Sequence, residues 1–165
     1  DPEEYFWNQL WDVREFCLHE ELRKPRNLDI GSGSGHPGIP LAIVSGGKWT
    51  LAESEKRKAD FLSRVKDRLS LDQVDVVPGR AEVHLRSHRV DLITAKAVAN
   101  TQKLVTTFGK CSTWNIFVLF KSGGFRQEWE TAVQPAQRVG LKLAAEYPYR
   151  AREKERTLAV IHRQR

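Results

Sequence analysis

Three glycines at alternate positions form the segment of this sequence that points most clearly to chemistry. The segment DIGSGSG runs from Asp29 to Gly35, with Gly31 and Gly33 between them, and it follows a short apolar run typical of a buried strand. Glycine adopts positive φ and lets the backbone approach a ligand that any Cβ would push away. Beside such a loop, the Asp29 carboxylate favours a ligand with an ammonium group and would repel a pyrophosphate. S-adenosylmethionine carries such an ammonium group, which makes it the candidate ligand.

An acidic residue follows at the end of the next expected strand. Glu53 lies 22 residues after Gly31, where a carboxylate can accept hydrogen bonds from both ribose hydroxyls of an adenosine. The segment from Gly33 to Gly38 also fits the dinucleotide-binding pattern G-x-G-x-x-G. A dinucleotide motif should begin directly after the strand, whereas this segment begins three residues after it and includes Pro37. In a further interpretation, the glycines form only a tight turn and Glu53 caps the next helix.

Alternating strands and helices must position these residues. The expected strands cover residues 28–30, 49–53, 74–78, 90–95, 115–121, 141–147 and 157–162, and the expected helices cover 2–22, 39–46, 55–69, 100–110 and 126–138. A polar loop at 149–155 joins the last two strands. This order predicts an α/β, Rossmann-like fold with a seven-stranded, mostly parallel sheet, an antiparallel edge hairpin, and helices on both faces. We expect one domain over residues 1–165, with an N-terminal helical part at 1–25 and the core at 26–165.

Composition narrows the classes of function. The 27 lysines and arginines outnumber the 21 aspartates and glutamates, and the resulting formal charge of +6 favours an anionic partner. Cys17, Cys111 and the five histidines lack metal-ligand spacing, so we expect no metal. No apolar run is long enough for a membrane helix, and the acidic, aromatic N-terminus differs from a signal peptide. We therefore expect a cytoplasmic protein without a membrane partner.

Four ordered segments carry a resemblance to a known family. They are NLDIGSGSGHPGIPLAI, LAESEKRKADFL, VVPGRAE and DLITAKAVA. The Pro-Gly-Ile-Pro after the glycine loop is a feature that ordinary methyltransferase loops lack. Together these segments are closely similar to the RsmG family (GidB, glucose-inhibited division protein B), the ribosomal small-subunit RNA methyltransferases G. The resemblance spans residues 1–122, and from residue 123 onward only the layout is similar.

This resemblance implies a class I methyltransferase fold and an activity. The family transfers a methyl group from S-adenosylmethionine to N7 of a guanine in small-subunit (16S) ribosomal RNA, which leaves S-adenosylhomocysteine. Matching positions imply cofactor contacts at Gly31, His36, Ala81 and Glu82. Lys96 stands where the family has the Arg of its T-A-R-A-V-A motif. The positive charge is kept, but the planar guanidinium, which can form two parallel hydrogen bonds, is lost. The expected cofactor-binding residues are Asp29, Gly31, Gly33, Gly35, His36, Glu53, Ala81, Glu82 and Lys96.

The N-terminal segment departs further from the family. The family shows a His-x-x-Asp-Ser element in its N-terminal helix, preceded by more helical sequence. Alignment on Asp12 places Gln9 at the His and Val13 at the Ser. The sequence contains no Met and therefore no initiator. It resembles an N-terminally shortened and divergent member of the family.

The implied chemistry needs little catalytic machinery. Guanine N7 carries no proton, so its methylation requires no general base, and the enzyme mainly aligns the attack on the methyl group. The fourth expected strand is not followed by the Asp/Asn-Pro-Pro-aromatic motif of methyltransferases that act on exocyclic amines. Neither Cys17 nor Cys111 has the Pro-Cys context of the cysteine nucleophiles that attack pyrimidines. We therefore expect positioning residues and assign no catalytic base or nucleophile.

Basic residues at strand ends are the candidates for positioning. Lys96 and Lys121 end the fourth and fifth expected strands, at the carboxyl edge where open α/β sheets bind their ligands. The basic cluster at 23–26 could also meet a phosphate backbone. We expect Lys103 and Arg126 to be solvated surface charges.

Two other features are expected to be structural. The basic helix at 55–69 presents a solvent-exposed face, with Glu55 and Lys58 at helical spacing. Trp7 and Trp11 lie four residues apart and are expected to pack the N-terminal helix against the sheet.

The expected partner is ribosomal RNA or the small ribosomal subunit, and the expected state is a monomer. One alternative is an S-adenosylmethionine-dependent methyltransferase for another RNA or a small molecule, which the departures at Gln9, Val13 and Lys96 motivate. A second alternative is a non-catalytic RNA- or ribosome-binding relative that keeps the fold and the basic surface.

Overall fold

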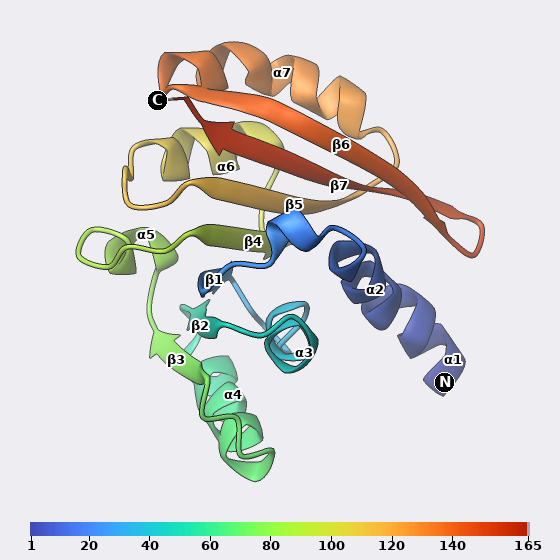
Figure 1. Cartoon of the computed structure of the whole chain (residues 1–165), viewed down its shortest axis with the longest axis vertical. Helices are drawn as coiled ribbons and strands as arrows, with labels where there is room; N and C mark the ends of the chain where they lie inside the picture. Colours follow the sequence, from blue (N-terminus) through green and yellow to red (C-terminus); the bar gives the residue numbers. More distant parts are fainter. Residues whose placement is uncertain (165) are drawn as a thin grey trace.

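One seven-stranded sheet organises the computed structural model, which describes residues 1–164 (Figure 1). The strands are β1 (Arg26–Ile30), β2 (Lys48–Glu53), β3 (Val74–Pro78), β4 (Leu92–Lys96), β5 (Ile116–Ser122), β6 (Leu141–Ala151) and β7 (Lys154–Arg163). They lie in the order β3-β2-β1-β4-β5-β7-β6, with β1 to β5 parallel and β7 antiparallel to β5 and β6. The predicted mixed sheet with its antiparallel edge hairpin is confirmed.

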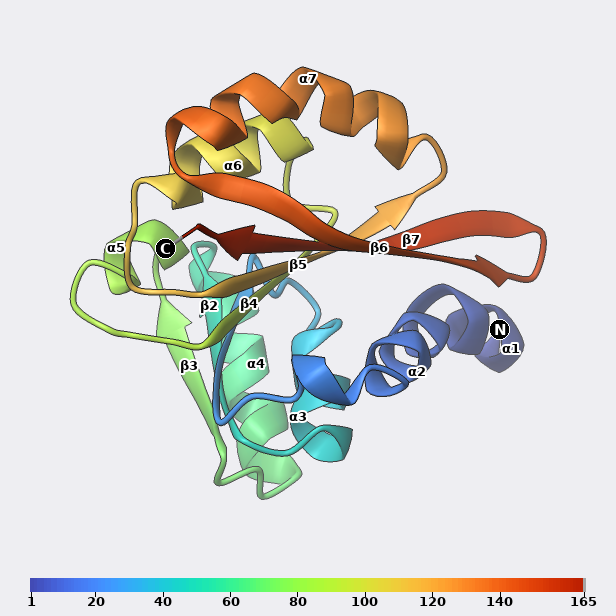
Figure 2. The same ribbon diagram turned by 45° about the horizontal axis from the view of Figure 1, so that its top comes forward.

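Helices cover both faces of this sheet (Figure 2). One face carries α2 (Trp11–Cys17), α3 (Gly38–Val44) and α4 (Lys56–Arg68), and the other carries α5 (Ala81–His84), α6 (Thr101–Gly109) and α7 (Phe125–Arg138). Phe117 and Val118 of β5 are both fully buried although they point to opposite faces. Parallel strands covered on both sides require such continuous apolar runs.

The topology brings the ends of distant strands together. The carboxyl ends of β1 to β5 all lie at the same edge, because these strands are parallel. The direction of winding reverses between β1 and β4, which are neighbours in the sheet. Open α/β sheets bind their ligands at such a switch point, so we expect the functional site at this edge.

The predicted N-terminal helix at 2–22 is wrong at its C-terminal end. Helix α1 (Pro2–Tyr5) continues through a wide π turn (Phe6–Leu10) into α2, which ends at Cys17, and a short 3-10 turn follows at Glu20–Leu22. Leu18 is 59% exposed, whereas Leu22 is 1% exposed. Residues four apart share a face of a helix, so a continued helix could not give these two side chains opposite environments. The apolar spacing alone did not reveal this break.

The predicted polar loop at 149–155 is also wrong. Strand β6 extends to Ala151 and β7 begins at Lys154, which leaves a two-residue turn. Arg150 and Glu155 are opposite one another in the ladder, where opposite charges stabilise a strand pair. The hairpin tip lies beside the N-terminal helix (Figure 1), and the Trp11 indole N–H donates a hydrogen bond of 2.9 Å to the Arg150 carbonyl. Trp11 therefore joins this helix to the sheet, as expected.

Phe16 offers a test of how the N-terminal helix is held. Its side chain is fully buried and stacks on Phe120 of β5, with the ring centroids 6.3 Å apart. We expect Phe16→Ala to lower the free energy of unfolding by about 3–5 kcal/mol, because it leaves a cavity in the core. Denaturant titration measures this loss. The exposed neighbour provides the control: Leu18→Ala should change stability by less than about 0.5 kcal/mol, and equal losses in the two variants would contradict this packing.

Candidate functional site

The glycine loop (Gly31–Gly35) joins β1 to α3 at the carboxyl edge of the sheet. Gly31, Gly33 and Gly35 have φ values of 60°, 53° and 96°, which confirms the predicted use of glycine. A Cβ added at Gly31 would come within 3.1 Å of the Val98 side chain, whereas one at Gly33 would meet no atom closer than the Gly31 carbonyl oxygen at 3.7 Å. The backbone at Gly33 is therefore open to the approach of a ligand.

Glu53 is held directly against this loop. Its Oε2 accepts a hydrogen bond of 2.8 Å from the Gly33 N–H, and its Oε1 accepts one of 2.8 Å from the Glu55 N–H. An ionised carboxylate has about four acceptor positions, so Glu53 retains capacity for two further donors. The structure brings together the two features that the sequence paired. The bond to Glu55 shows that Glu53 also contacts the segment that begins α4, although the N-cap position itself is occupied by Glu55.

The next predicted cofactor residues, Ala81 and Glu82, follow the turn after β3. The Gly79 N–H donates to the Glu53 carbonyl oxygen at 3.0 Å, which places this turn beside the end of β2. Ala81 and Glu82 begin α5, so their N–H groups lack acceptors within the helix. Glu82 also borders a separate hollow of about 400 Å³, where the Cys111 thiol donates to the Glu82 carbonyl at 3.9 Å. The N–H groups of Ala81 and Glu82 are therefore the groups of this turn that remain for a ligand.

His36 connects the glycine loop to the N-terminal helix. Its Nε2 lies 2.5 Å from the Tyr5 hydroxyl, and the two rings meet edge to face. Burial lowers the pKa of His36, and the nearby Lys96 ammonium lowers it further. The imidazole is therefore neutral at pH 7. The sequence analysis did not anticipate Tyr5 in this region.

Asp29 lies beneath the loop rather than beside an open site. Its side chain has no exposed surface, because its position in β1 directs it toward α3. The Thr94 hydroxyl donates to Oδ1 at 2.6 Å, and Oδ2 packs against Gly38, where an added Cβ would come within 2.7 Å. Burial raises the pKa of Asp29 to about 6, although the hydrogen bonds oppose this shift. The expected direct contact with a ligand ammonium group is therefore not available from this buried position.

A buried carboxylate links three distant segments at the same edge. Asp12 is 1% exposed. Its Oδ2 lies 2.7 Å from the Lys96 ammonium, while its Oδ1 accepts hydrogen bonds of 2.6 Å from both the Arg156 guanidinium and the Tyr149 hydroxyl. Burial and the adjacent Asp12 charge raise the pKa of Tyr149, which keeps this hydroxyl protonated. The N-terminal helix, the end of β4 and the hairpin are thereby held together.

The wide π turn supplies further acceptors to this cluster. The Asn8 carbonyl oxygen accepts from Lys96 Nζ at 2.8 Å and from Arg156 at 3.2 Å. Gln9 Oε1 accepts a third bond from Lys96 Nζ at 3.0 Å. An ammonium group has three donors, so Asp12, Asn8 and Gln9 satisfy Lys96 completely. The residues that differ from the family at Gln9 and Lys96 thus contact one another.

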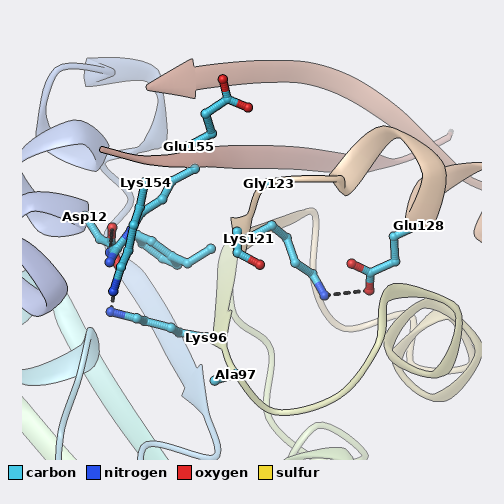
Figure 3. A pocket seen from close by; sticks show the side chains of 11 residues that line it. Asp12, Lys96, Ala97, Lys121, Gly123, Glu128, Lys154 and Glu155 are labelled. Atoms are coloured by element: carbon cyan, nitrogen blue, oxygen red, sulfur yellow. Dashed lines mark hydrogen bonds and ion pairs between the residues drawn. The ribbon is translucent and has the colours of Figure 1, made fainter. Parts of the chain in front are cut away.

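A pocket of about 670 Å³ opens beside this cluster, at the carboxyl ends of β4 and β5. Lys96 and Lys121 both line it, as Figure 3 shows. Lys121 Nζ lies 2.8 Å from Glu128 Oε1 and donates to the Ala99 carbonyl at 3.3 Å. Lys154 of the hairpin forms another part of the wall. The structure therefore unites both predicted positioning lysines in one pocket.

The sequence analysis missed several residues of this pocket and its support. Tyr149 and Arg156 were placed in or just after a loop, and Glu128 lies within a helix with no distinctive motif around it. Asp12 served only as an alignment point. The resemblance to the His-x-x-Asp-Ser element was the one signal for Asp12. No spacing in the sequence indicated Tyr149, Arg156 or Glu128.

Residues expected to be surface charges are exposed. The Arg126 side chain is 83% exposed and lies 3.1 Å from Glu146, and Lys103 is exposed on α6. The expected Glu55–Lys58 pair forms at 2.7 Å on the exposed face of α4. These positions therefore provide charge-matched controls for the pocket lysines.

Residues 1–164 hold neither a candidate metal cluster nor a membrane-crossing helix. They contain no group of three or more His, Cys, Asp and Glu side chains arranged to hold a metal ion. In the same described part of the chain, every helix is too short or too polar to cross a bilayer.

The buried Asp29 predicts a specific pH dependence of stability. Its pKa is raised from 3.8 to about 6 on folding, so the protonated form favours the folded state. This stabilisation is fully present below pH 4 and is lost as the pH rises to about 6. The loss lowers the free energy of unfolding by about 3 kcal/mol. We expect Asp29→Asn to remove this step in the free energy of unfolding, measured by denaturant titration from pH 4 to 7. The exposed carboxyl in Asp60→Asn is the control, and parallel pH curves for wild type and Asp29→Asn would contradict the prediction.

Comparison with known proteins agrees with the sheet and the motifs. A family model described as rRNA small subunit methyltransferase G matches residues 1–154. A relative from Solibacter usitatus named Ribosomal RNA small subunit methyltransferase G is 37% identical over 127 residues, which are 74% of this chain and 60% of that protein. The chain thus spans about three fifths of the length of this curated relative.

Solved structures show the same fold at low sequence identity. A mutant of MtNAS in complex with S-adenosylmethionine has a TM-score of 0.73 and 21% identity, over 98% of this chain and 64% of that one. A methyltransferase from Pyrococcus furiosus has a TM-score of 0.70 and 11% identity, over 93% and 83%. The predicted Rossmann-like class I methyltransferase fold is confirmed, and, with the match over residues 1–154, the chain belongs to the rRNA small subunit methyltransferase G family.

Proposed function

We propose that this chain binds S-adenosylmethionine and transfers its methyl group to N7 of a guanine in small-subunit ribosomal RNA. The observation that carries this proposal is the closure of the glycine loop onto Glu53, at the same edge of the sheet as the pocket at the carboxyl ends of β4 and β5 that Lys96 and Lys121 line. The family and its relatives provide the substrate class. We infer that the chain acts in the cytoplasm on ribosomal RNA or the small subunit.

The residues around the glycine loop fit the expected cofactor. The backbone at Gly33 is open, and Glu53 keeps acceptor capacity for the two ribose hydroxyls. The N–H groups of Ala81 and Glu82 are available to ring nitrogens of an adenine, because they begin a helix. His36 follows the loop directly, and Lys96, which lines the pocket, is close enough to lower the pKa of His36. Asp29 supports the loop from below.

Bound S-adenosylmethionine supplies a methyl group attached to a positively charged sulfur. The guanine N7 lone pair forms the new bond to the methyl carbon while the carbon–sulfur bond breaks, and sulfur keeps that electron pair. No proton has to leave N7, so the chain needs no base for this step. The residues of the pocket instead hold the RNA in line with the methyl group. Lys121 provides positive charge for phosphate groups near the reacting base, whereas Lys96, whose three donors go to Asp12, Asn8 and Gln9, positions the wall of the pocket.

The glycine loop provides the direct test of cofactor binding. We expect Gly31→Asp to weaken S-adenosylmethionine binding at least about 100-fold, or ~2.7 kcal/mol, because the new side chain would meet Val98 and add negative charge to the loop. Calorimetric titration, with NAD as a second ligand, measures the affinity. Gly46→Asp is the matched control, since Gly46 also has positive φ but has open space around it. Wild-type binding of NAD alone would contradict the proposal, and wild-type binding of neither ligand would favour the non-catalytic RNA-binding alternative.

Lys121 provides the test of RNA positioning. We expect Lys121→Ala to lower kcat/KM on unmethylated small-subunit ribosomal RNA by about 10- to 100-fold, the value of a charge-assisted hydrogen bond. The Kd for S-adenosylmethionine should stay unchanged, because Lys121 lies outside the glycine loop. The exposed Lys103→Ala is the control for net charge. Transfer of labelled methyl groups to small molecules, without an RNA product, would favour the alternative substrate class.

A further inference from the structure

A second charged groove lies at the opposite edge of the sheet from the glycine loop. It has a volume of about 720 Å³ and is formed by the amino ends of β1, β4 and β5 and the carboxyl end of the antiparallel β7. Lys24, Arg89, His162 and Arg163 contribute its basic side chains. None of these residues contributes to the cofactor site or to the pocket that contains Lys121.

The acidic residue in this groove is already neutralised. Asp91 accepts hydrogen bonds from the Arg26 guanidinium at 3.1 Å and 2.8 Å and from the Arg26 N–H at 3.2 Å. These bonds with Arg26 lower the pKa of Asp91 and keep it ionised. Within residues 1–164, Lys24 and Arg89 have no carboxylate oxygen within 4.0 Å, although the Arg89 charge helps to lower the pKa of Asp91 and the Lys24 charge helps to lower that of Glu21. Their charges are therefore available to an external anion.

The pKa of His162 is affected by the positive charges around the groove. Burial lowers its pKa, and the ammonium groups of Lys142 and Lys24 lower it further. Lys142 pairs with His162 across β6 and β7, whereas Lys24 comes from the segment before β1. Two lysines from different elements thus converge on one neutral imidazole. Ser112 and Asn115 also line the groove, Asn115 next to Arg163, whose N–H donates to the Asn115 carbonyl at 3.1 Å, and their polar side chains are of the kind that contact phosphate oxygens.

Arg163 gives one side of the groove a fixed geometry. Its Nη2 donates to the Gly109 carbonyl at 3.2 Å and to the Cys111 carbonyl. Its guanidinium lies over the Trp114 ring, 4.7 Å from the ring centroid, and Trp114 is fully buried. Arg163 is held by these contacts, whereas Lys24 and Arg89 have no such ion-pair partner within the described residues and are the cations left to meet a ligand.

From these contacts we propose that the amino-edge groove binds phosphate groups of the RNA substrate at a point distant from the methylated base. The proposal rests on the proposed function, which supplies RNA as the substrate. Strands of five to seven residues separate this groove from the Lys121 pocket, a distance of roughly 17–23 Å at about 3.3 Å per residue. One nucleotide cannot span this distance, so the groove contacts a different part of the RNA.

The experiment compares RNA binding by two double variants. Lys24→Gln/Arg89→Gln removes the two unpaired cations of the groove, and Arg68→Gln/Arg138→Gln removes two exposed charges elsewhere. Fluorescence anisotropy with a labelled, unmethylated small-subunit ribosomal RNA transcript, in the presence of S-adenosylhomocysteine, gives Kd as a function of salt. We expect the groove variant to reduce the slope of log K against log salt by about 1.4–1.8, the value for two phosphate contacts. The control variant should keep the wild-type slope.

A second readout follows His162 directly. Its ring signals, assigned by their loss in His162→Gln, report its pKa by NMR, and that pKa should rise when RNA phosphates neutralise Lys24 and Lys142. Kd for S-adenosylmethionine should be the same in all variants. The groove proposal is overturned, and the proposed function stands, under the following result. Wild type binds the transcript, both double variants keep the wild-type slope of log K against log salt, and the His162 pKa does not move. If wild type neither binds nor methylates the transcript, both proposals fall.

Discussion

The buried carboxylate of Asp12 is the constraint on which the rest of the site depends. An ionised group without solvent access is tolerated only when charges and hydrogen bonds compensate for its lost hydration. Lys96, Arg156 and Tyr149 provide that compensation, and each belongs to a different part of the chain. The Asp12 carboxylate therefore sets the relative positions of the N-terminal helix, the end of β4 and the hairpin. The pocket at the carboxyl ends of β4 and β5 opens beside this cluster, and Asp12, Lys96 and Arg156 form part of its wall.

Different interactions shape the glycine loop and the pocket, and the two lie next to each other. The loop is shaped by positive φ and by the bond between Gly33 and Glu53, which depends on the adjacency of β1 and β2. The pocket is shaped by ion pairs between side chains. His36 and Lys96 lie where the two meet, since His36 contacts the N-terminal helix and the Lys96 charge affects its pKa. The Lys96 ammonium of the Asp12 cluster thus lies close enough to the loop to affect the charge state of His36.

Local patterns predicted much of the fold and part of the candidate site. The apolar strands, the loop glycines and Glu53 follow from short-range chemistry, and the structure confirms their arrangement. The N-terminal helix and the hairpin turn were misplaced, because tertiary contacts override local spacing there. Leu22 turns inward to fill the core, and the charged residues around Arg150 form strands because they pair with each other and rest on Trp11. Asp29 was predicted beside a ligand and is buried beneath the loop instead.

By itself the sequence determined the order of strands and helices, the glycine loop and the family, because these depend on residue types within a few positions of one another. The tertiary structure decided which charges meet. Asp12 and Arg156 are 144 residues apart and become partners only when β7 inserts between β5 and β6. The basic groove likewise assembles from Lys24, Arg89 and His162 at the amino ends of strands that are neighbours only in the sheet. Electrostatic energy depends on distance in space, and no local pattern in the chain encodes that distance.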